Sequence, residues 1–596
     1  MLKFEVRPRQ TRWYTALSLL ALLVAPGQSS AQRARSEPVA ADPLAQGLAA
    51  ITPSLIEAPL RLLADDLMEG RAPGTRGGDL AARYLASQFA GLGLKPGAPD
   101  GSFYQWVSLA GLTTEASVVV GAQRRTLVLE PGTEIVAWPQ RADSLATLDA
   151  EIVFAGYGIT APEWDWDDYK GAAQTGRIVM VLPNEPGAGD STLFCGNALT
   201  AYGLWTHKLE QAARMGAAGV LLVHTPQAEP LPWAAIRSSW SGERVLPDRP
   251  PTQSLRFAAW ITADAARRIV EATGKDYGLL LQRARLRDFR PLDVGARAAV
   301  DLRSRVRRFR SPNVIARLDG ADSLGRADVV LVTAHYDHLG TGPSQGTDSI
   351  YNGAVDNASG LAVMLAAATA LSRAGSAPRR SVVFAATTAS EAGGLGATTY
   401  LGQPPAPLDR TVAVVNLDRA NVWGPTRDVV ALGGELSTLG DWVTAAARAE
   451  TLQVASDPFP HLGDFYQSDQ AAFARAGIPA VWLRSGIQYP EKGAGWGAEQ
   501  WRAYLEQRYH RPSDHVHQDF DYRGLVQLAR VLSRLAWSLA QGTDFPTWLP
   551  GAEFRPAGQR LRPAPDTGAI PWTCPAHTGY RSTGCDSMLA PRLSGG

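Results

Sequence analysis

The stretch "ADVVLVTAHYDHLG", residues 327–340, passes from an apolar run directly into two histidines and an aspartate. Its apolar part predicts a buried strand, and the polar residues that follow would lie where that strand ends. Similar apolar runs predict further strands at residues 381–388, 411–418 and 478–486. Helical patterns accompany them, at residues 357–375 and 520–541. Strands that alternate with helices predict an α/β domain, with a mixed, mostly parallel sheet flanked by helices.

The composition of the whole chain excludes several classes of protein. The 596 residues are 45% hydrophobic and 19% charged, which is enough apolar material for more than one globular domain. The formal net charge of +1 gives no overall field that would attract nucleic acid or an anionic membrane. The basic stretch "RSRVRRFR" (303–310) is interpreted as a solvated strand or the edge of a linker.

The N-terminus has the pattern of an export signal. Four basic residues precede the apolar run "ALSLLALLVA" (16–25), and a Pro-Gly break and small residues that suit cleavage after Ala31 follow it. This run is too short to span a bilayer comfortably, and no other stretch is long and apolar enough. We therefore expect a signal peptide over residues 1–31, no stable membrane span in the mature chain, and a periplasmic or secreted location.

Composition shifts divide the rest of the chain. The region 140–300 has strands of its own and is rich in Trp and Pro, which indicates an inserted, β-rich module with a small separate core. The predicted parts are the start of the main domain at 32–139, the insert at 140–300, the rest of the main domain at 301–545, and a C-terminal extension at 546–596.

The chain has three cysteines. Cys574 and Cys585 bracket a short C-terminal loop, and an oxidising compartment favours a disulfide between them. A metal site that includes His577 is an alternative, but it lacks a fourth ligand. If the disulfide forms, Cys195 is unpaired, and we expect it to be buried.

Acidic and histidine side chains gather at the predicted strand ends. Each comes from a different loop, and α/β sheets bind ligands beyond the carboxyl ends of their strands. One such residue alone is more often a helix cap or a loop hydrogen bonder, but five at one sheet edge indicate a shared site. Imidazole and carboxylate ligands together suit zinc, and a shared carboxylate can hold two ions that activate one water. The five are His335, Asp356, Glu391, Asp418 and His510.

The motifs that carry these residues resemble a known family. "AHYDHLG", "YNGAVDNASG", "SEAGGLGA", "VNLD" and "YHRPSD" occur in the order and approximate spacing of the co-catalytic di-zinc aminopeptidases of peptidase family M28. "EGRAPGTRGGDLAARYLASQF" is similar to the family's N-terminal segment, and the insert at 140–300 resembles a protease-associated domain. The resemblance therefore covers nearly the whole mature chain. Relatives in this family include glutamate carboxypeptidase, glutaminyl cyclase and the transferrin receptor.

The resemblance implies how these five residues would hold metal. Asp356 would bridge two zinc ions. His335 and Asp418 would complete one site, and Glu391 and His510 the other. Manganese or cobalt would also suit such ligands.

The resemblance also implies roles around the metals. Asp337 would orient the imidazole of His335 from behind. Tyr509 would stabilise the oxyanion of the tetrahedral intermediate, and Asp469 is a candidate substrate-binding residue. The implied reaction is hydrolysis of the N-terminal bond of a peptide or protein by a metal-bridging hydroxide.

One position departs from the family pattern. Most members carry a general-base glutamate directly before the ligand glutamate, whereas this chain has Ser390 before Glu391. A serine hydroxyl does not take a proton from water near neutral pH, and general-base catalysis is typically worth about 10²- to 10⁴-fold.

Three interpretations of Ser390 remain open. The protein is a slow or unconventional peptidase, which relies on metal-bound hydroxide or on a carboxylate from another loop. Alternatively, it is a metal-binding pseudoenzyme that binds peptides or proteins. In the third interpretation the alignment is locally shifted and Glu391 is the base, at the cost of one metal ligand.

Two other activities fit the sequence less well. A glutaminyl-cyclase-like transferase would share the fold but use one zinc, and the His335-x-Asp337 pair fits the two-metal peptidases better. "GPSQG" (342–346) matches the serine-hydrolase motif formally, but it lies in a predicted loop rather than a strand–turn–helix elbow. The remaining histidines, including His338, are interpreted as supporting or solvent-facing. Nothing in the sequence indicates the oligomeric state.

Overall fold

A computed structural model describes residues 42–123, 125–187, 190, 192–225, 232–240, 242–249 and 255–554. The described chain from Pro43 onward belongs to one unit. The predicted signal peptide at 1–31 and the predicted Cys574–Cys585 disulfide lie outside the described residues.

A mixed sheet forms the centre of the main domain. Its strands run in the order β19-β18-β20-β17-β13-β16-β12. The pairs β16–β13, β13–β17, β17–β20 and β18–β19 are parallel, and the pairs β12–β16 and β18–β20 are antiparallel. The predicted mixed, mostly parallel α/β sheet is therefore confirmed. Its strands are β13 (Val329–His335), β16 (Ser381–Thr387), β17 (Thr411–Asn416), β18 (Asp428–Leu432), β19 (Gln453–Ala455), β20 (Ala480–Ser485) and β12 (Leu292–Leu318).

Helices cover both faces of this sheet, so every residue of β13 is buried. Val330 and Val332 of β13 pack into the larger core, and Val329 and Leu331 face the smaller core on the other side. The larger core is built with α2 (Pro53–Leu63), α3 (Arg76–Gly91), α8 (Ser359–Ser372), α10 (Leu439–Ala449) and α13 (Arg523–Gln541). The smaller core is built with α9 (Leu395–Gly402) and α11 (Gln470–Arg475).

The α8 helix is unusually apolar because it is a core helix. Together with the π-helical turn before it, it covers Ala354–Ser372, the one described helix that is long and apolar enough to cross a membrane. The expectation that no second stretch has this length and composition is therefore wrong. All of its apolar window is buried inside the protein. The turn at its start places Asp356 at the carboxyl-end edge of the sheet.

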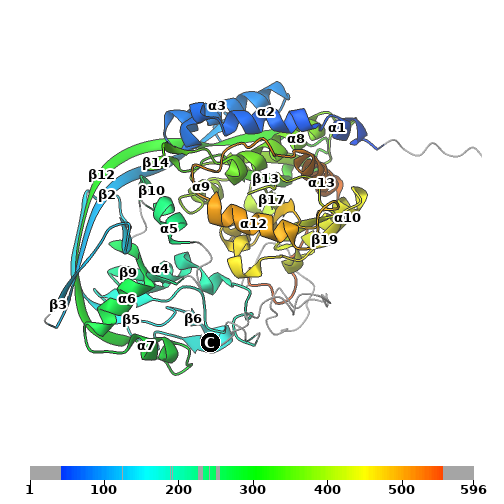
Figure 1. The fold of residues 1–596 in the computed structure, drawn as a ribbon. Helices are drawn as coiled ribbons and strands as arrows, with labels where there is room; N and C mark the ends of the chain where they lie inside the picture. Colours follow the sequence, from blue (N-terminus) through cyan, green and yellow to red (C-terminus); the bar gives the residue numbers. More distant parts are fainter. Residues whose placement is uncertain are drawn as a thin grey trace, which may run out of the picture. The chain divides into compact units, whose positions relative to one another are not determined.

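A long two-stranded ribbon leads from the main sheet to the insert and back (Figure 1). β2 (Tyr104–Ala122) runs outward and β12 (Leu292–Leu318) returns, with continuous antiparallel pairing from Tyr104↔Val314 to Ala122↔Ala296. Beyond the main sheet, β12 pairs with β5 of the insert. The basic stretch 303–310 lies within this ribbon, where Arg307 and Arg308 form ion pairs with Glu243 and Asp248.

The insert is an α/β layer in its own right. Its sheet runs β12-β5-β8-β9-β11-β4, and its helices are α4 (Trp205–Arg214), α5 (Trp233–Trp240), α6 (Ala263–Glu271) and α7 (Tyr277–Ala284). Val118, Leu129 and Ile135 belong to its core, so this core begins before residue 140. The added strands are β4 (Ile135–Pro139), β5 (Leu145–Phe154), β8 (Ile178–Val181), β9 (Gly219–His224) and β11 (Phe257–Thr262).

Cys195 differs from the expectation. It is buried, as predicted, but it is disulfide-bonded. The prediction of an unpaired thiol is therefore wrong. That prediction followed from pairing the two C-terminal cysteines with each other on the basis of their short spacing, and short spacing says nothing about which segments fold together.

Candidate metal centre

Five side chains meet at the carboxyl-end edge of the main sheet, and we call them the acid–histidine cluster. His335 is the last residue of β13, Glu391 and Asp418 follow β16 and β17, and Asp356 lies in the turn before α8. His510 lies in the loop after α12 (Trp496–Gln507). The five residues predicted from their separate loops are therefore brought together.

Asp356 is the centre of the cluster. Its Oδ1 lies 3.3 Å from Nε2 of His335, and its Oδ2 lies 3.2 Å from Nε2 of His510. Oδ1 of Asp418 is 3.4 Å from the same His335 nitrogen, and Oε2 of Glu391 is 3.1 Å from the same His510 nitrogen. The cluster thus has two halves that share one carboxylate.

The outer nitrogens of both imidazoles are held by neighbours. Nδ1 of His335 lies 3.0 Å from the backbone carbonyl oxygen of Asp337. Nδ1 of His510 lies 2.6 Å from Oγ of Ser239, which belongs to the insert. Contacts of this kind fix the orientation of an imidazole and leave its inner nitrogen for coordination.

The outer oxygens of two carboxylates are held in the same way. Ser468 donates a hydrogen bond to Oδ2 of Asp418 at 2.6 Å. Nδ1 of His338 lies 2.8 Å from Oε1 of Glu391. His338 is buried and therefore supports the cluster directly, a more specific role than its sequence context indicated.

The spacing of the inner atoms fits metal ions. Ligand atoms 2.0–2.2 Å from one tetrahedral zinc ion lie about 3.3–3.6 Å from each other. The inner separations of 3.1–3.4 Å are close to these values. Nε2 of His510 is enclosed, and the carboxylate oxygens of Asp356 and Glu391 lie 3.2 and 3.1 Å from it, so this nitrogen and both oxygens face the same point. The ligand atoms of His335, Asp356 and Glu391 all lie within 4.8 Å of one another.

The imidazoles and the carboxylates of the cluster strongly shift each other's pKa values. Burial alone would lower the pKa of His510, but the carboxylates of Glu391 and Asp356 outweigh burial and raise that pKa to about 9. Burial would likewise raise the pKa of Glu391, but His510 and His338 hold it well below its usual range. Concentrated negative charge at these carboxylates is what a divalent cation requires.

Backbone strain gathers beside the cluster. Ala389, Arg419 and His510 all have positive φ, at 53°, 41° and 57°. Each such residue costs on the order of 1–3 kcal/mol and persists only where the surrounding structure requires it. Ala389 and Arg419 lie within two residues of Glu391 and Asp418, and His510 itself belongs to the cluster. The strained backbone therefore orients side chains of the cluster.

Asp514 holds the loop that carries the central carboxylate. Its two carboxylate oxygens accept hydrogen bonds from the backbone nitrogens of Val355 and Asp356 at 3.0 and 3.1 Å, and the hydroxyl of Tyr504 donates to it at 3.2 Å. Sequence reasoning did not single out Asp514. Its signal was its position in "YHRPSD", only four residues after His510.

Arg71 ties the N-terminal segment to the same loops. Its buried guanidinium donates to the carbonyl oxygens of Tyr336 at 2.8 Å, Asn352 at 2.5 Å and Gly353 at 3.0 Å. The Gly/Pro-rich loop "EGRAPG" therefore acts as a clamp on the site loops. Its composition predicted a loop but could not reveal this contact.

Asp337 lies behind the cluster, where its carboxylate binds backbone N–H groups. Its carboxylate accepts hydrogen bonds from the backbone nitrogens of Ser390 at 3.1 Å and Glu391 at 3.3 Å. Oδ1 of Asp337 is 3.8 Å from Nδ1 of His335, whose closer contact is the Asp337 carbonyl oxygen. Asp337 thus positions His335 through its backbone and Glu391 through its side chain.

Ser390 and Asp469 are neighbours on the floor of the site. The hydroxyl of Ser390 donates to Oδ1 of Asp469 at 3.0 Å, and Thr387 donates to the other oxygen. Burial raises the pKa of Asp469, although His335 and the two hydroxyls lower it in part. A buried carboxylate therefore stands next to the position where family members carry their general base.

Tyr509 packs face to face on His510, with ring centroids 3.9 Å apart. The guanidinium of Arg419 lies 5.2 Å from the Tyr509 ring, and its Nε is 3.8 Å from Oδ1 of Asp418. Arg419 thus borders both the cluster and a neighbouring hollow.

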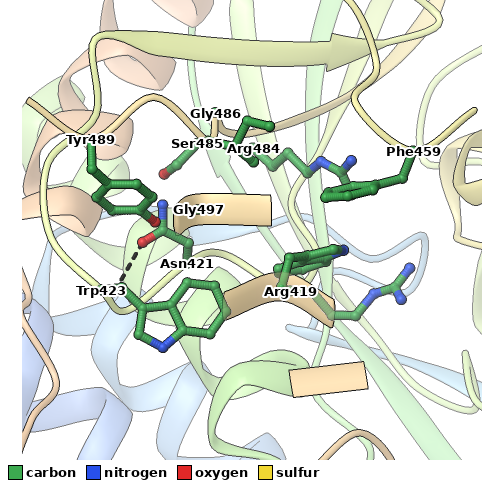
Figure 2. A pocket seen from close by; sticks show the side chains of 11 residues that line it. Arg419, Asn421, Trp423, Phe459, Arg484, Ser485, Gly486, Tyr489 and Gly497 are labelled. Carbon is green, nitrogen blue, oxygen red and sulfur yellow. Dashed lines mark hydrogen bonds between the residues drawn. The ribbon is translucent and has the colours of Figure 1, made fainter. Parts of the chain in front are cut away.

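That hollow is a narrow pocket with a cavity volume of about 10 Å³. Figure 2 shows Trp423 and Tyr489 on one side of the pocket, and Phe459 with the guanidiniums of Arg484 and Arg419 on the other. Both guanidiniums are paired with the buried carboxylate of Asp464, at 3.0 and 2.8 Å. The pocket wall is therefore aromatic, and its arginine charges are largely balanced.

Part of the chain is similar to known proteins. Residues 313–536 match the model of peptidase family M28. These residues form a peptidase family M28 domain. All five members of the cluster lie within the M28 domain, and the resemblance expected from the sequence motifs is confirmed.

A curated relative of the M28 domain is leupeptin-inactivating enzyme 1 of Streptomyces exfoliatus, which is 26% identical over 247 residues. The alignment covers 41% of this chain and 51% of that enzyme, so the chain spans about half the length of the relative.

Solved structures with similar coordinates include an aminopeptidase from Aneurinibacillus sp. strain AM-1, at 18% identity and a TM-score of 0.49, covering 84% of this chain and 97% of that chain. A peptidase M28 precursor from Shewanella amazonensis is 17% identical with a TM-score of 0.45, covering 85% and 99%. A zinc aminopeptidase from Bacillus subtilis is 17% identical with a TM-score of 0.43, covering 82% and 95%.

Proposed function

We propose that this protein is an exported metallo-aminopeptidase with two zinc ions, and that its insert is a protease-associated domain. The observation that carries the proposal is Asp356, whose two oxygens each approach a different imidazole, with a second carboxylate beside each. This arrangement supports one ion in each half of the cluster. It supports a two-ion peptidase over a cyclase with one zinc.

The residues around the cluster have separate tasks in this proposal. Zinc ions held there would lower the pKa of a water between them and polarise the carbonyl of the bond to be cut. Tyr509 donates a hydrogen bond to the oxyanion of the tetrahedral intermediate. A carboxylate of the cluster binds the free amine of the peptide.

Ser390 and Asp469 together replace the missing glutamate. The 3.0 Å hydrogen bond from Ser390 Oγ to Asp469 Oδ1 supports a concerted relay, in which the Asp469 carboxylate accepts the hydroxyl proton of Ser390 while Ser390 Oγ accepts a proton from the attacking water. The carboxylate of Asp469, which comes from another loop, then acts as the general base.

The proposal is tested with the mature protein, residues 32–596, loaded with zinc and offered a panel of aminoacyl-p-nitroanilides. We expect hydrolysis that a chelator abolishes and added zinc restores. Absence of turnover across the panel, with bound zinc shown by elemental analysis, would instead favour the second candidate, a metal-dependent peptide-binding protein. The serine at position 390 is the observation that favours that candidate.

Replacement of Ser239 by alanine is expected to weaken zinc binding by about 10- to 100-fold, because His510 loses the neighbour that fixes its imidazole. Competition with a chelating dye measures the affinity. Ser238→Ala is the matched control, since Ser238 Oγ bonds only to carbonyls of its own helix. Equal zinc affinities for both variants would show that the insert does not support the metal centre.

A further inference from the structure

A buried asparagine lies behind the acid–histidine cluster. Asn416 is the last residue of β17, two positions before Asp418, and it is 1% exposed. Its register partner on β13 is Thr333, two positions before His335. The hydroxyl of Thr333 donates a hydrogen bond to Oδ1 of Asn416 at 2.7 Å. Asn416 therefore links the two strands whose ends carry His335 and Asp418.

The amide nitrogen of Asn416 has two partners in a later segment of the chain. It donates to Oγ of Ser468 at 2.9 Å and to Oε1 of Gln470 at 2.7 Å. An amide NH₂ group has two hydrogens, so both are used. Ser468 and Gln470 are the neighbours of Asp469, the carboxylate of the proposed relay. Asn416 therefore holds the chain on both sides of Asp469.

These hydrogen bonds also fix the direction of the next ones. Ser468 Oγ accepts from Asn416, and its own hydrogen points to Oδ2 of Asp418, 2.6 Å away. Oδ2 is then occupied, so Oδ1 of Asp418 is left for a metal ion. Gln470 is fixed in the same way, because its Nε2 donates to the carbonyl oxygen of Phe465 and its Oε1 must face Asn416.

Asp469 is held from two strands. Its carboxylate accepts from Thr387, the last residue of β16, and from Ser390 in the loop after β16. Its two chain neighbours are held by β17 through Asn416. A catalytic group that moves by about 1 Å can cost on the order of 100-fold in rate, so the support of Asp469 from β17 affects catalysis.

We propose that Asn416 is a positioning residue that fixes both Asp418, a metal ligand, and Asp469, the base, from one point of the sheet. The inference rests on the proposed two-metal peptidase and its relay, and it adds a residue on which both depend. One branch runs through Ser468 to the metal ligand, and the other runs through Gln470 to the base. Each branch can be cut by a substitution of its own.

The test cuts the two branches separately and then together. Ser468→Ala should weaken the affinity for one of the two zinc ions by about 10- to 100-fold, measured by competition with a chelating dye. Gln470→Met should keep both zinc affinities but lower kcat by about 10- to 100-fold at unchanged KM, measured with the aminoacyl-p-nitroanilide that the wild type hydrolyses fastest. Asn416→Leu should show both losses.

Two controls separate positioning from a general loss of stability. Asn313→Leu removes another buried asparagine with three hydrogen bonds, and it should leave both zinc affinities unchanged even if the protein unfolds at a lower temperature. Ser533→Ala removes a buried hydroxyl that donates to a carbonyl oxygen of its own helix, and it should match the wild type in both measurements.

A double variant identifies the ion that depends on Ser468. His335→Ala removes a ligand from the same half of the cluster, so adding Ser468→Ala should not weaken the remaining ion further. Unchanged zinc affinities in Asn416→Leu would overturn the inference. If Asn416→Leu does not fold, the branch variants decide, and equal zinc losses in Ser468→Ala and Gln470→Met would overturn it.

Failure of the proposed function would be recognised in the wild type. A wild-type protein that binds fewer than two zinc ions would overturn the proposed function and this inference together. A wild-type protein that binds two zinc ions but hydrolyses no substrate would overturn only the proposed function. The zinc measurement needs no substrate, so the loss of one ion's affinity in both Ser468→Ala and Asn416→Leu would still support the positioning role.

Discussion

Replacement of Asp356 by asparagine is expected to remove both zinc ions and to lower kcat/KM by more than about 100-fold. The carboxylate offers one oxygen to each half of the cluster, whereas an amide offers one oxygen and one NH₂ group. The NH₂ group cannot coordinate, and the amide also carries no charge to balance the cations. Elemental analysis after dialysis at fixed free zinc, together with initial rates, measures both effects.

Single-histidine variants show whether the loss is specific to the shared residue. His335→Ala and His510→Ala each remove a ligand from one half, so each should release one ion more readily than the other. Asp348→Asn is the matched control, because Asp348 is exposed and bonds only within its own turn. Two zinc ions per chain in Asp356→Asn would contradict the bridging role.

Replacement of Asp469 by asparagine is expected to lower kcat by about 10²- to 10⁴-fold while the zinc content stays unchanged. Asparagine keeps the shape of the side chain and can still accept from Ser390 and Thr387, but it cannot take up a proton. Burial raises the pKa of Asp469. The wild-type rate should therefore fall as the pH drops through this raised pKa, and the variant should lack that acidic limb.

Three variants identify the path of the proton. Ser390→Ala should resemble Asp469→Asn, because it interrupts the relay between the water and the carboxylate. Thr387→Val removes the other hydrogen bond of Asp469 and should change kcat little. Full activity in Asp469→Asn, combined with a gain in Ser390→Glu, would show that the peptidase has lost its base and has recruited no other.

The sequence was most informative where burial leaves a simple pattern. β13, β16, β17 and β20 are short and wholly buried, and each contains an apolar run of four or more residues. The cluster residues were found because each follows such a run or sits in a recognisable motif. β19 has three residues with no apolar run, so nothing in the sequence marks its position.

The insert shows what the sequence could not reveal. Ser239 contacts His510, which lies 271 residues further along the chain. A local sequence pattern cannot predict a contact between the insert and the main domain. The expected start of the insert at 140 followed a shift in composition. The core of the insert, however, includes the far end of β2, because half-exposed ribbon strands alternate too irregularly to mark a boundary.

The ribbon of β2 and β12 has a consequence for protein engineering. Because β12 pairs with β16 at one end and with β5 at the other, the insert shares a continuous strand with the main sheet and is not attached by a flexible linker. Deleting the insert would cut both β2 and β12 and leave unpaired strand edges, which promote aggregation. An insert from a relative would therefore have to be joined inside these strands, in matched register, and it would still have to place Ser239 against His510.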